Sequence, residues 1–217
     1  MSEKSFANNL KRFWDKFWFL VWKDDSFKGW ILSLVFIFII IKFIFFPGLS
    51  FITSTELPLA IVESCSMYHN GNLLSDFGEW FDDNEAKYSA FGIEKTEFQE
   101  FRMKNGFNKG DILLITGVKP ENIEIGEIII FSSGNSGTPI IHRVVSIERK
   151  VDGQGNLGFL TFSTMGDNNN GQLNSELSIS EGQIIGKAMF KIAPYLGWIK
   201  LVFYEPFKTS SDMGFCE

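Results

Sequence analysis

The sequence has little of what metal sites, disulfide frameworks and nucleic-acid surfaces require. Its 217 residues include two cysteines and two histidines, with no Cys-x-x-Cys pair, so we expect no metal ion and no cofactor. We expect Cys65 and Cys216 to be unpaired thiols, the alternative being a disulfide between them in an extracytoplasmic domain. The net charge of −6, without any Lys/Arg-rich stripe, argues against nucleic acid as a partner.

One long hydrophobic run is present. Residues 29–52 carry a single charge, at Lys42, and predict one transmembrane helix. The run is too long and begins too late for a cleavable signal peptide. Before it, residues 5–22 place aromatic side chains at helical spacing, which predicts an amphipathic helix for a membrane interface within an N-terminal segment, residues 1–28.

The charges beside this run predict its orientation. Six basic residues precede it, and after residue 52 no Lys or Arg occurs until Lys87. The positive-inside rule therefore predicts a single-pass protein with residues 1–28 in the cytoplasm and everything after residue 52 outside. The membrane would be the cell membrane, or that of the endoplasmic reticulum in a eukaryote.

After the run the pattern becomes that of β structure. Residues 56–64 predict a short strand, and short apolar segments separated by Gly, Asn and Pro follow from Lys109 onward. We therefore expect a mainly β fold, a compact antiparallel sheet or small barrel formed by residues 53–69 and 109–193. An aromatic tail, residues 194–217, is expected to pack on the sheet or touch the bilayer.

Residues 70–108 interrupt the β pattern and predict a partly helical insert, with a helix of three turns over residues 93–104. We expect its aromatic side chains to be exposed, namely Trp80, Phe81, Tyr88, Phe91 and Phe98. Its acids disfavour contact with an anionic membrane, namely Asp76, Glu79, Asp82, Asp83 and Glu85. A lid over a substrate groove or a dock for a partner is therefore favoured over a membrane paddle.

Three short motifs could carry chemistry. Ser66 ends the apolar segment in Ser64-Cys65-Ser66-Met67, His142 lies in an apolar strand before Arg-Val-Val, and Asp167 lies in the turn Gly166-Asp167-Asn168-Asn169. Taken singly, they read as a turn hydroxyl, a structural histidine and an Asx-turn acid. Taken together, they supply the nucleophile, base and orienting acid of acyl-transfer hydrolysis.

These motifs, in this order behind a membrane span, resemble the type I signal peptidases, membrane-bound serine endopeptidases that remove signal peptides from exported preproteins. The resemblance implies that Ser66 is the nucleophile, His142 the general base and Asp167 the acid beside that base. It also implies that Ser64 helps to bind the oxyanion, together with the Ser66 backbone N–H. Bacterial members usually have Lys at the base position, so the histidine resembles the archaeal and endoplasmic-reticulum branch.

The chain departs from the family pattern at several positions. Cys65 replaces the usual Gly, and Tyr68-His69 replaces a Glu/Tyr-Pro pair. Leu173 stands where a second Asp is common, which leaves Asn174 and Glu176 as the nearest polar substitutes. His69 is a rival candidate for the base.

The resemblance implies three partners: signal peptides of secretory preproteins, the lipid bilayer and the translocation machinery. It also implies small side chains at the first and third positions before the cleaved bond. Two alternatives stay open. One is a catalytically silent homologue that acts as a binding module, and the other is a specialised processing peptidase with one dedicated substrate.

Overall fold

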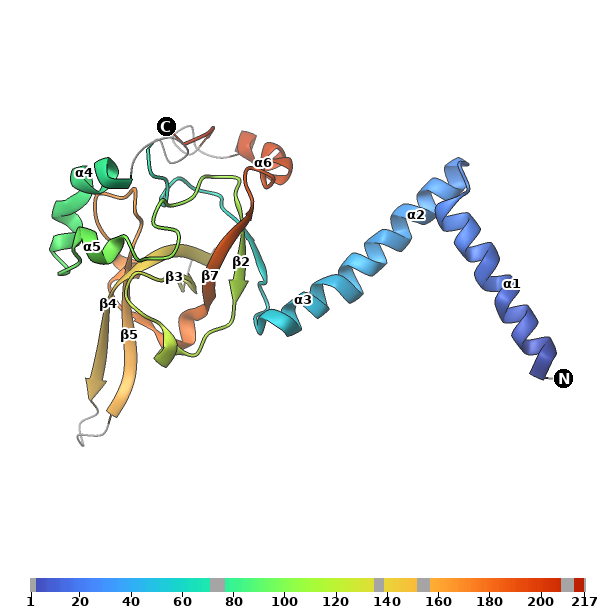
Figure 1. Ribbon diagram of the computed structural model, residues 1–217, viewed down its shortest axis with the longest axis horizontal. Coiled ribbons are helices and arrows are strands. Elements are labelled where there is room, and N and C mark those ends of the chain that lie inside the picture. Colours follow the sequence, from blue (N-terminus) through green and yellow to red (C-terminus); the bar gives the residue numbers. More distant parts are fainter. Residues whose placement is uncertain (1–2, 71–76, 135–138, 152–156, 208–212, 217) are drawn as a thin grey trace. The chain divides into compact units, whose positions relative to one another are not determined.

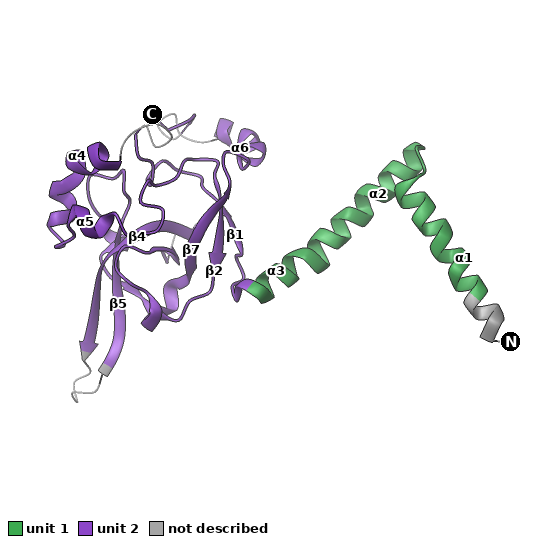
Figure 2. Ribbon diagram, in the orientation of Figure 1, with its two compact units in different colours: residues 1–52 green, residues 53–217 purple. Residues whose placement is uncertain are grey.

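The computed structural model describes residues 3–70, 77–134, 139–151, 157–207 and 213–216. The chain divides into two compact units, residues 1–52 and residues 53–217 (Figure 2).

The N-terminal unit is helical. Its elements are α1 (Glu3–Trp22), α2 (Phe27–Ile40), the π-helical turn η1 (Ile41–Phe45) and α3 (Phe46–Thr53). α1 confirms the helix expected over residues 5–22. Ser26 caps α2 by accepting a hydrogen bond from the Gly29 backbone N–H, 3.1 Å away. The Phe17 and Phe36 rings, 5.3 Å apart between centroids, pack α1 against α2.

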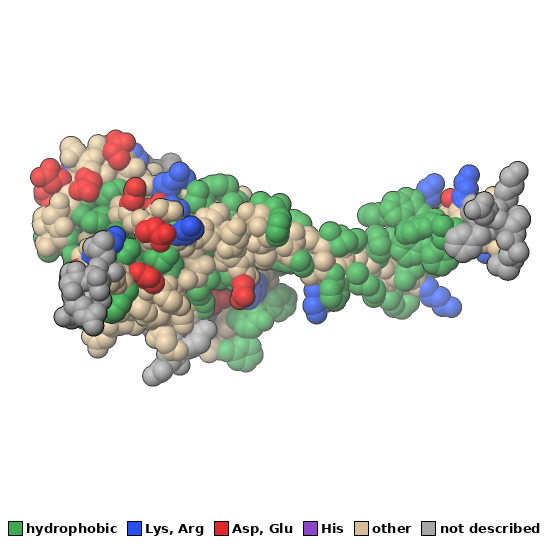
Figure 3. All heavy atoms as spheres, turned by 90° about the horizontal axis from the view of Figure 1, so that it is seen from below, with side chains coloured by type: hydrophobic (Ala, Val, Ile, Leu, Met, Phe, Trp, Pro, Cys, Tyr) green, Lys and Arg blue, Asp and Glu red, His purple; other side chains and the backbone are tan. Residues whose placement is uncertain are grey.

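The helical stretch Phe27–Thr53 is long and apolar enough to cross a membrane, as judged by length and composition. Its wide turn η1 ends just before Pro47, which has no N–H to donate to the preceding turn. Lys42 lies in this turn, with its ammonium 5.5 Å from the centroid of the Phe43 ring. Large apolar side chains are exposed along this unit, as Figure 3 shows.

The C-terminal unit is built on one seven-stranded antiparallel sheet, which confirms the mainly β fold (Figure 1). The strand order is β1-β2-β7-β3-β4-β5-β6. The strands are β1 (Leu59–Ile61), β2 (Ile112–Thr116), β3 (Ile128–Ser132), β4 (Pro139–Val151), β5 (Leu157–Met165), β6 (Ile179–Ser180) and β7 (Ile184–Ala193). The helical elements outside the insert are η2 (Pro120–Asn122), η3 (Asn174–Glu176), η4 (Glu181–Gln183), α6 (Trp198–Tyr204) and η5 (Glu205–Phe207).

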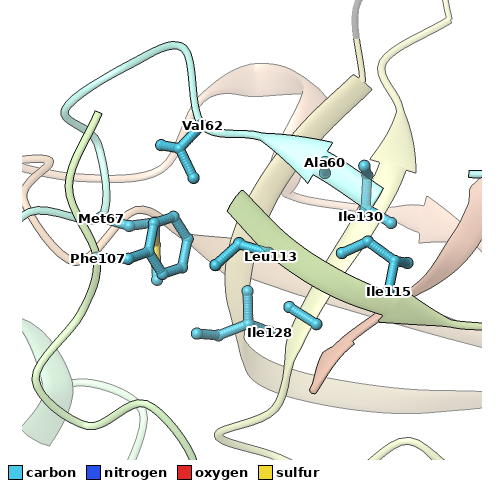
Figure 4. Close-up of a cluster of buried hydrophobic side chains, with 9 residues drawn as sticks. Ala60, Val62, Met67, Phe107, Leu113, Ile115, Ile128 and Ile130 are labelled. Atoms are coloured by element: carbon cyan, nitrogen blue, oxygen red, sulfur yellow. The ribbon is translucent and has the colours of Figure 1, made fainter. Parts of the chain in front are cut away.

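β3 is buried on both faces and divides the core into two parts. Ile128 and Ile130 pack in a cluster with residues of β1, β2 and β7 (Figure 4). Ile129 and Phe131 point the other way and pack in a second cluster with residues of β4, β5 and β6. Because side chains alternate along a strand, a continuous apolar run such as Ile-Ile-Ile-Phe suits a strand covered on both sides.

The insert forms α4 (Phe77–Ser89) and α5 (Lys95–Phe98), and Asp76 lies outside the described residues. Two expectations were wrong. The three-turn helix over 93–104 is only the single turn α5, and a helix not expected from the sequence, α4, precedes it. Of the five aromatics expected to be exposed, four are buried and Phe91 is half-buried. Their cluster packs against Val145 of β4 and Met165 of β5, so the insert is an integral layer of the domain.

The expectation of two unpaired thiols was also wrong, because Cys65 and Cys216 form a disulfide across 151 residues of sequence. Next to Cys216, the Phe215 ring packs on Trp198 of α6, with 4.4 Å between the ring centroids. The disulfide therefore ties the end of the chain to the residue that precedes Ser66.

Candidate active site

Ser66 lies on the segment that leaves β1. Backbone hydrogen bonds hold the start of this segment: Val62 N–H donates to Asp111 and Gly110 N–H donates to Val62, both at 2.9 Å. Ser66 is half-buried, and its Oγ lies 3.1 Å from the Ser64 Oγ. The two hydroxyls predicted to act together are therefore adjacent.

His142 is brought to Ser66 from β4. It pairs with Ile129 of β3, and only 3% of its surface is exposed. Its Nε2 lies 2.7 Å from the Ser66 Oγ, within hydrogen-bonding distance. The structure thus brings together the predicted nucleophile and the predicted base, which are 76 residues apart in sequence.

The carboxylate that contacts His142 is that of Glu176. Its Oε1 is hydrogen-bonded to the His142 Nδ1 and accepts a further bond from the Thr164 hydroxyl at 3.1 Å. Its Oε2 accepts a bond from the Leu173 backbone N–H at 2.7 Å. Glu176 is fully buried and ends η3, so three donors hold its side chain in one orientation.

The expectation that Asp167 lies beside His142 was wrong. Asp167 is fully buried and accepts bonds from Arg143 Nε at 2.9 Å and Arg143 Nη2 at 2.6 Å. It also accepts a bond from the Tyr88 hydroxyl at 2.9 Å. The reason is strand alternation: Arg143 follows His142 in β4, so their side chains lie on opposite faces and an acid that meets one cannot meet the other.

Burial alone would raise the pKa of Asp167, but the Arg143 guanidinium and the His69 hydrogen bond together hold it well below its usual value. Asp167 is therefore a charged structural centre. It holds the turn 166–169 against Arg143 and, through Tyr88, against the insert.

His69, the rival base, bonds this same acid. Its Nε2 lies 2.8 Å from the Asp167 Oδ2, and its ring stacks on Trp80 at 3.4 Å between centroids. Burial lowers the pKa of His69 and outweighs the opposing effect of Asp167, which keeps the imidazole neutral near pH 7. This bonding commits His69 to the structural centre rather than to Ser66.

A groove of about 730 Å³ lies beside Ser66 and His142. Apolar side chains from both of its walls line it, including Leu59, Ile61, Ile130 and Ile140. β1 is the edge strand of the sheet, with β2 as its partner on one side. Such an edge can accept an extended peptide as an added strand, which would lay it in an apolar groove next to the hydroxyl.

A hydroxyl, an imidazole and a buried carboxylate in one hydrogen-bonded line are the working parts of a serine hydrolase. Of these three, Glu176 was named from the sequence only as a substitute for a missing acid. Its one signal was its position on the loop after the Gly-Asp-Asn-Asn turn. No group of three or more His, Cys, Asp or Glu residues in the described part of the chain could hold a metal ion.

The resemblance seen in the motifs is confirmed by curated relatives, which are signal peptidase catalytic subunits of the endoplasmic-reticulum-like branch. The human signal peptidase complex catalytic subunit SEC11C is 30% identical over 115 residues, covering 49% of this chain and 56% of that protein. The subunit sec11 of Dictyostelium discoideum is 30% identical over 104 residues, covering 46% and 54%. The chain thus spans about half the length of the curated relatives it matches. No family model matches the sequence.

Proposed function

We propose that this chain is a membrane-bound serine endopeptidase that removes signal peptides from exported preproteins. The observation that carries the proposal is the line from Ser66 through His142 to Glu176 at one end of an apolar groove. The curated relatives, named as signal peptidase catalytic subunits, support the reaction and the substrate class.

In the proposed reaction, His142 Nε2 takes the proton of the Ser66 hydroxyl as its oxygen attacks the substrate carbonyl. The Ser66 N–H and the Ser64 hydroxyl stabilise the oxyanion that forms, a donor of this kind being worth about 10²–10³ in rate. His142 then gives its proton to the leaving amine, which leaves an ester on Ser66. A water molecule, deprotonated by His142, hydrolyses that ester and frees the hydroxyl. Glu176 keeps the His142 Nδ1 protonated and stabilises the imidazolium.

The groove supports an extended substrate, and the resemblance to the family implies small side chains next to the cleaved bond. β1 offers its open edge to the substrate backbone, and the walls offer aliphatic contacts. This arrangement favours a peptidase over a catalytically silent binding module, because a module that only binds has no use for a serine that is hydrogen-bonded to a histidine.

The catalytic domain is proposed to lie outside the cytoplasm, anchored by the helix Phe27–Thr53. The charges before this helix support an N-terminus in the cytoplasm. The Cys65–Cys216 disulfide adds independent support, since disulfides persist in oxidising compartments. A protease added outside sealed vesicles should digest the domain after residue 52 and spare residues 1–28, and the opposite pattern would overturn the orientation.

The reaction is tested with the full chain in detergent and an internally quenched peptide that carries small residues at the first and third positions before its cleaved bond. Ser66→Ala and His142→Ala should each lower kcat by at least about 10³-fold with an unchanged thermal unfolding midpoint. Ser89→Ala, an exposed serine of the insert, is the matched control and should keep full activity. Cleavage by Ser66→Ala would exclude the proposed nucleophile.

The base is tested separately, because the chain has two histidines. His69→Gln should retain activity when folded, whereas His142→Lys should be inactive, since an ammonium placed beside Glu176 stays protonated. If His69→Gln is folded but dead and His142→Ala active, the base has been assigned to the wrong histidine.

A further inference from the structure

The turn 166–169 contacts the nucleophile segment directly, although none of its residues belongs to the Ser66–His142–Glu176 line. The Asn168 backbone N–H donates to the Ser66 carbonyl at 2.8 Å. The Asn168 side-chain amide donates to the Cys65 carbonyl at 3.1 Å. No side chain fits at Gly166, because its Cβ would lie 2.8 Å from the Ser66 carbonyl oxygen.

The second of these bonds acts on a peptide group of the proposed reaction. The Cys65 carbonyl and the Ser66 N–H belong to one planar trans peptide unit and point in opposite directions. A donor that fixes the carbonyl therefore fixes the direction of the N–H. That N–H is the backbone donor assigned to the oxyanion.

The turn is braced in its place from the insert. The Lys87 ammonium of α4 donates to the carbonyl of Asp167 and, at 3.3 Å, to that of Asn169. These two carbonyls flank Asn168 in the sequence. The same ammonium lies over the rings of Trp80 and Tyr88, at 5.8 and 5.6 Å from their centroids, and both rings belong to the buried cluster of the insert.

We propose that Asn168 is a positioning residue that aims the Ser66 N–H at the oxyanion, and that Lys87 braces Asn168 from the insert. This inference rests on the proposed peptidase function. It gives the insert a role in the reaction that does not require it to touch the substrate. Removing one oxyanion donor lowers the rate by about 10²–10³-fold. If the donor stays but its direction is no longer fixed, we expect a smaller loss of rate, about 10- to 100-fold.

The test compares Asn168→Ala and Asn168→Asp with Asn174→Asp, an exposed asparagine further along the same loop that serves as control. Both Asn168 variants lose the donor to Cys65, and we expect kcat to fall about 10- to 100-fold with KM changed less than about twofold. The thermal unfolding midpoint should stay near that of the wild type, because Asn168 is exposed and its backbone N–H is kept. A change confined to KM would mean that Asn168 binds substrate, and unchanged kinetics would mean that it has no role. Either result overturns the proposal.

The brace is tested with Lys87→Met, which keeps much of the apolar stem and loses the ammonium. Its kcat should fall, as in Asn168→Ala. The double variant Lys87→Met/Asn168→Ala should lose little more kcat than either single variant. Lys87→Arg should restore most of the rate, whereas Lys95→Met, which removes an exposed ion pair of the same insert, should change nothing. Additive losses in the double variant would refute the coupling. Failure of the peptidase proposal looks different, since the wild type would then cleave no peptide or Ser66→Ala would still cleave it.

Discussion

Replacing each of the two buried carboxylates in turn by its neutral amide should separate an effect on catalysis from an effect on stability. In Glu176→Gln the side chain keeps its shape but presents one oxygen and one NH₂ group to three donors: His142 Nδ1–H, the Thr164 hydroxyl and the Leu173 N–H. Either the NH₂ group faces the Leu173 N–H, or it faces His142 and favours the wrong tautomer. Replacing the carboxylate beside a catalytic histidine by its neutral amide typically lowers kcat by about 10⁴-fold, which corresponds to about 5 kcal/mol of transition-state stabilisation.

Asp167→Asn should have the opposite profile. It leaves the fully buried Arg143 guanidinium without its carboxylate, and breaking a buried pair from one side costs about 3–5 kcal/mol of unfolding free energy. Since whole domains are stable by about 5–15 kcal/mol, this variant should melt far below the wild type, yet its folded fraction should still cleave the peptide.

The assay measures kcat and the thermal unfolding midpoint of both variants in one detergent, with kcat corrected for the folded fraction at low temperature. We expect Glu176→Gln to be folded and nearly inactive, and Asp167→Asn to be unstable but to keep a much higher kcat per folded molecule than Glu176→Gln, since Asp167 acts on the site only through the turn 166–169. A stable, inactive Asp167→Asn together with an active Glu176→Gln would refute this reasoning and return the acid to Asp167.

Three further predictions concern stability. The pKa of His69 is lowered in the folded state, so the unfolded chain binds more protons than the folded one below about pH 6.5. The free energy of unfolding should therefore decrease as the pH is lowered, by up to about 1.4 kcal/mol per pH unit. His69→Gln should flatten that slope between pH 6.5 and 5 in denaturant titrations, and an unchanged slope would contradict the assignment. Cys216→Ser should lower the free energy of unfolding by about 2–5 kcal/mol, because it removes the disulfide. A dithiol reductant should have the same effect on the wild type and none on the variant. Replacing residues 77–106 by a Gly-Ser linker should abolish cooperative unfolding, because it removes a buried aromatic cluster, and a linker variant with a sharp native-like melt would refute this.

The sheet could be predicted from the sequence because its signals are local. Each β segment expected from the run of short apolar stretches became a strand, including the completely apolar run at β3. The insert could not be predicted in the same way. Its acids and aromatics suggested a solvated lid, but the apolar face of α4 is buried only because β4 and β5 provide Val145 and Met165, which are distant in sequence. Tertiary packing decided which aromatics were exposed.

The pairing of Ser66 with His142 was predicted correctly in its geometry because it rests on motifs and on the alternation of one strand. The disulfide was not predicted, since the proximity of Cys65 and Cys216 depends on tertiary contacts such as that between Phe215 and Trp198 of α6. The acid beside His142 was missed for a related reason. Glu176 reaches His142 from a short 3-10 turn on a connecting loop, and no periodic pattern specifies where such a turn lies.

Acceptor capacity explains why the two carboxylates cannot exchange places. A carboxylate offers about four acceptor positions, and Asp167 fills them with two bonds from Arg143, one from Tyr88 and one from His69. Nothing remains for a second histidine on the opposite face of β4. Glu176 accepts three bonds, one of them from His142, and contacts no guanidinium or ammonium among the described residues. Its charge is therefore available to the imidazolium that forms in the proposed reaction. The same chemical pair, a histidine on a buried carboxylate, thus gives a structural centre where a guanidinium is present and a candidate catalytic pair where a serine hydroxyl is.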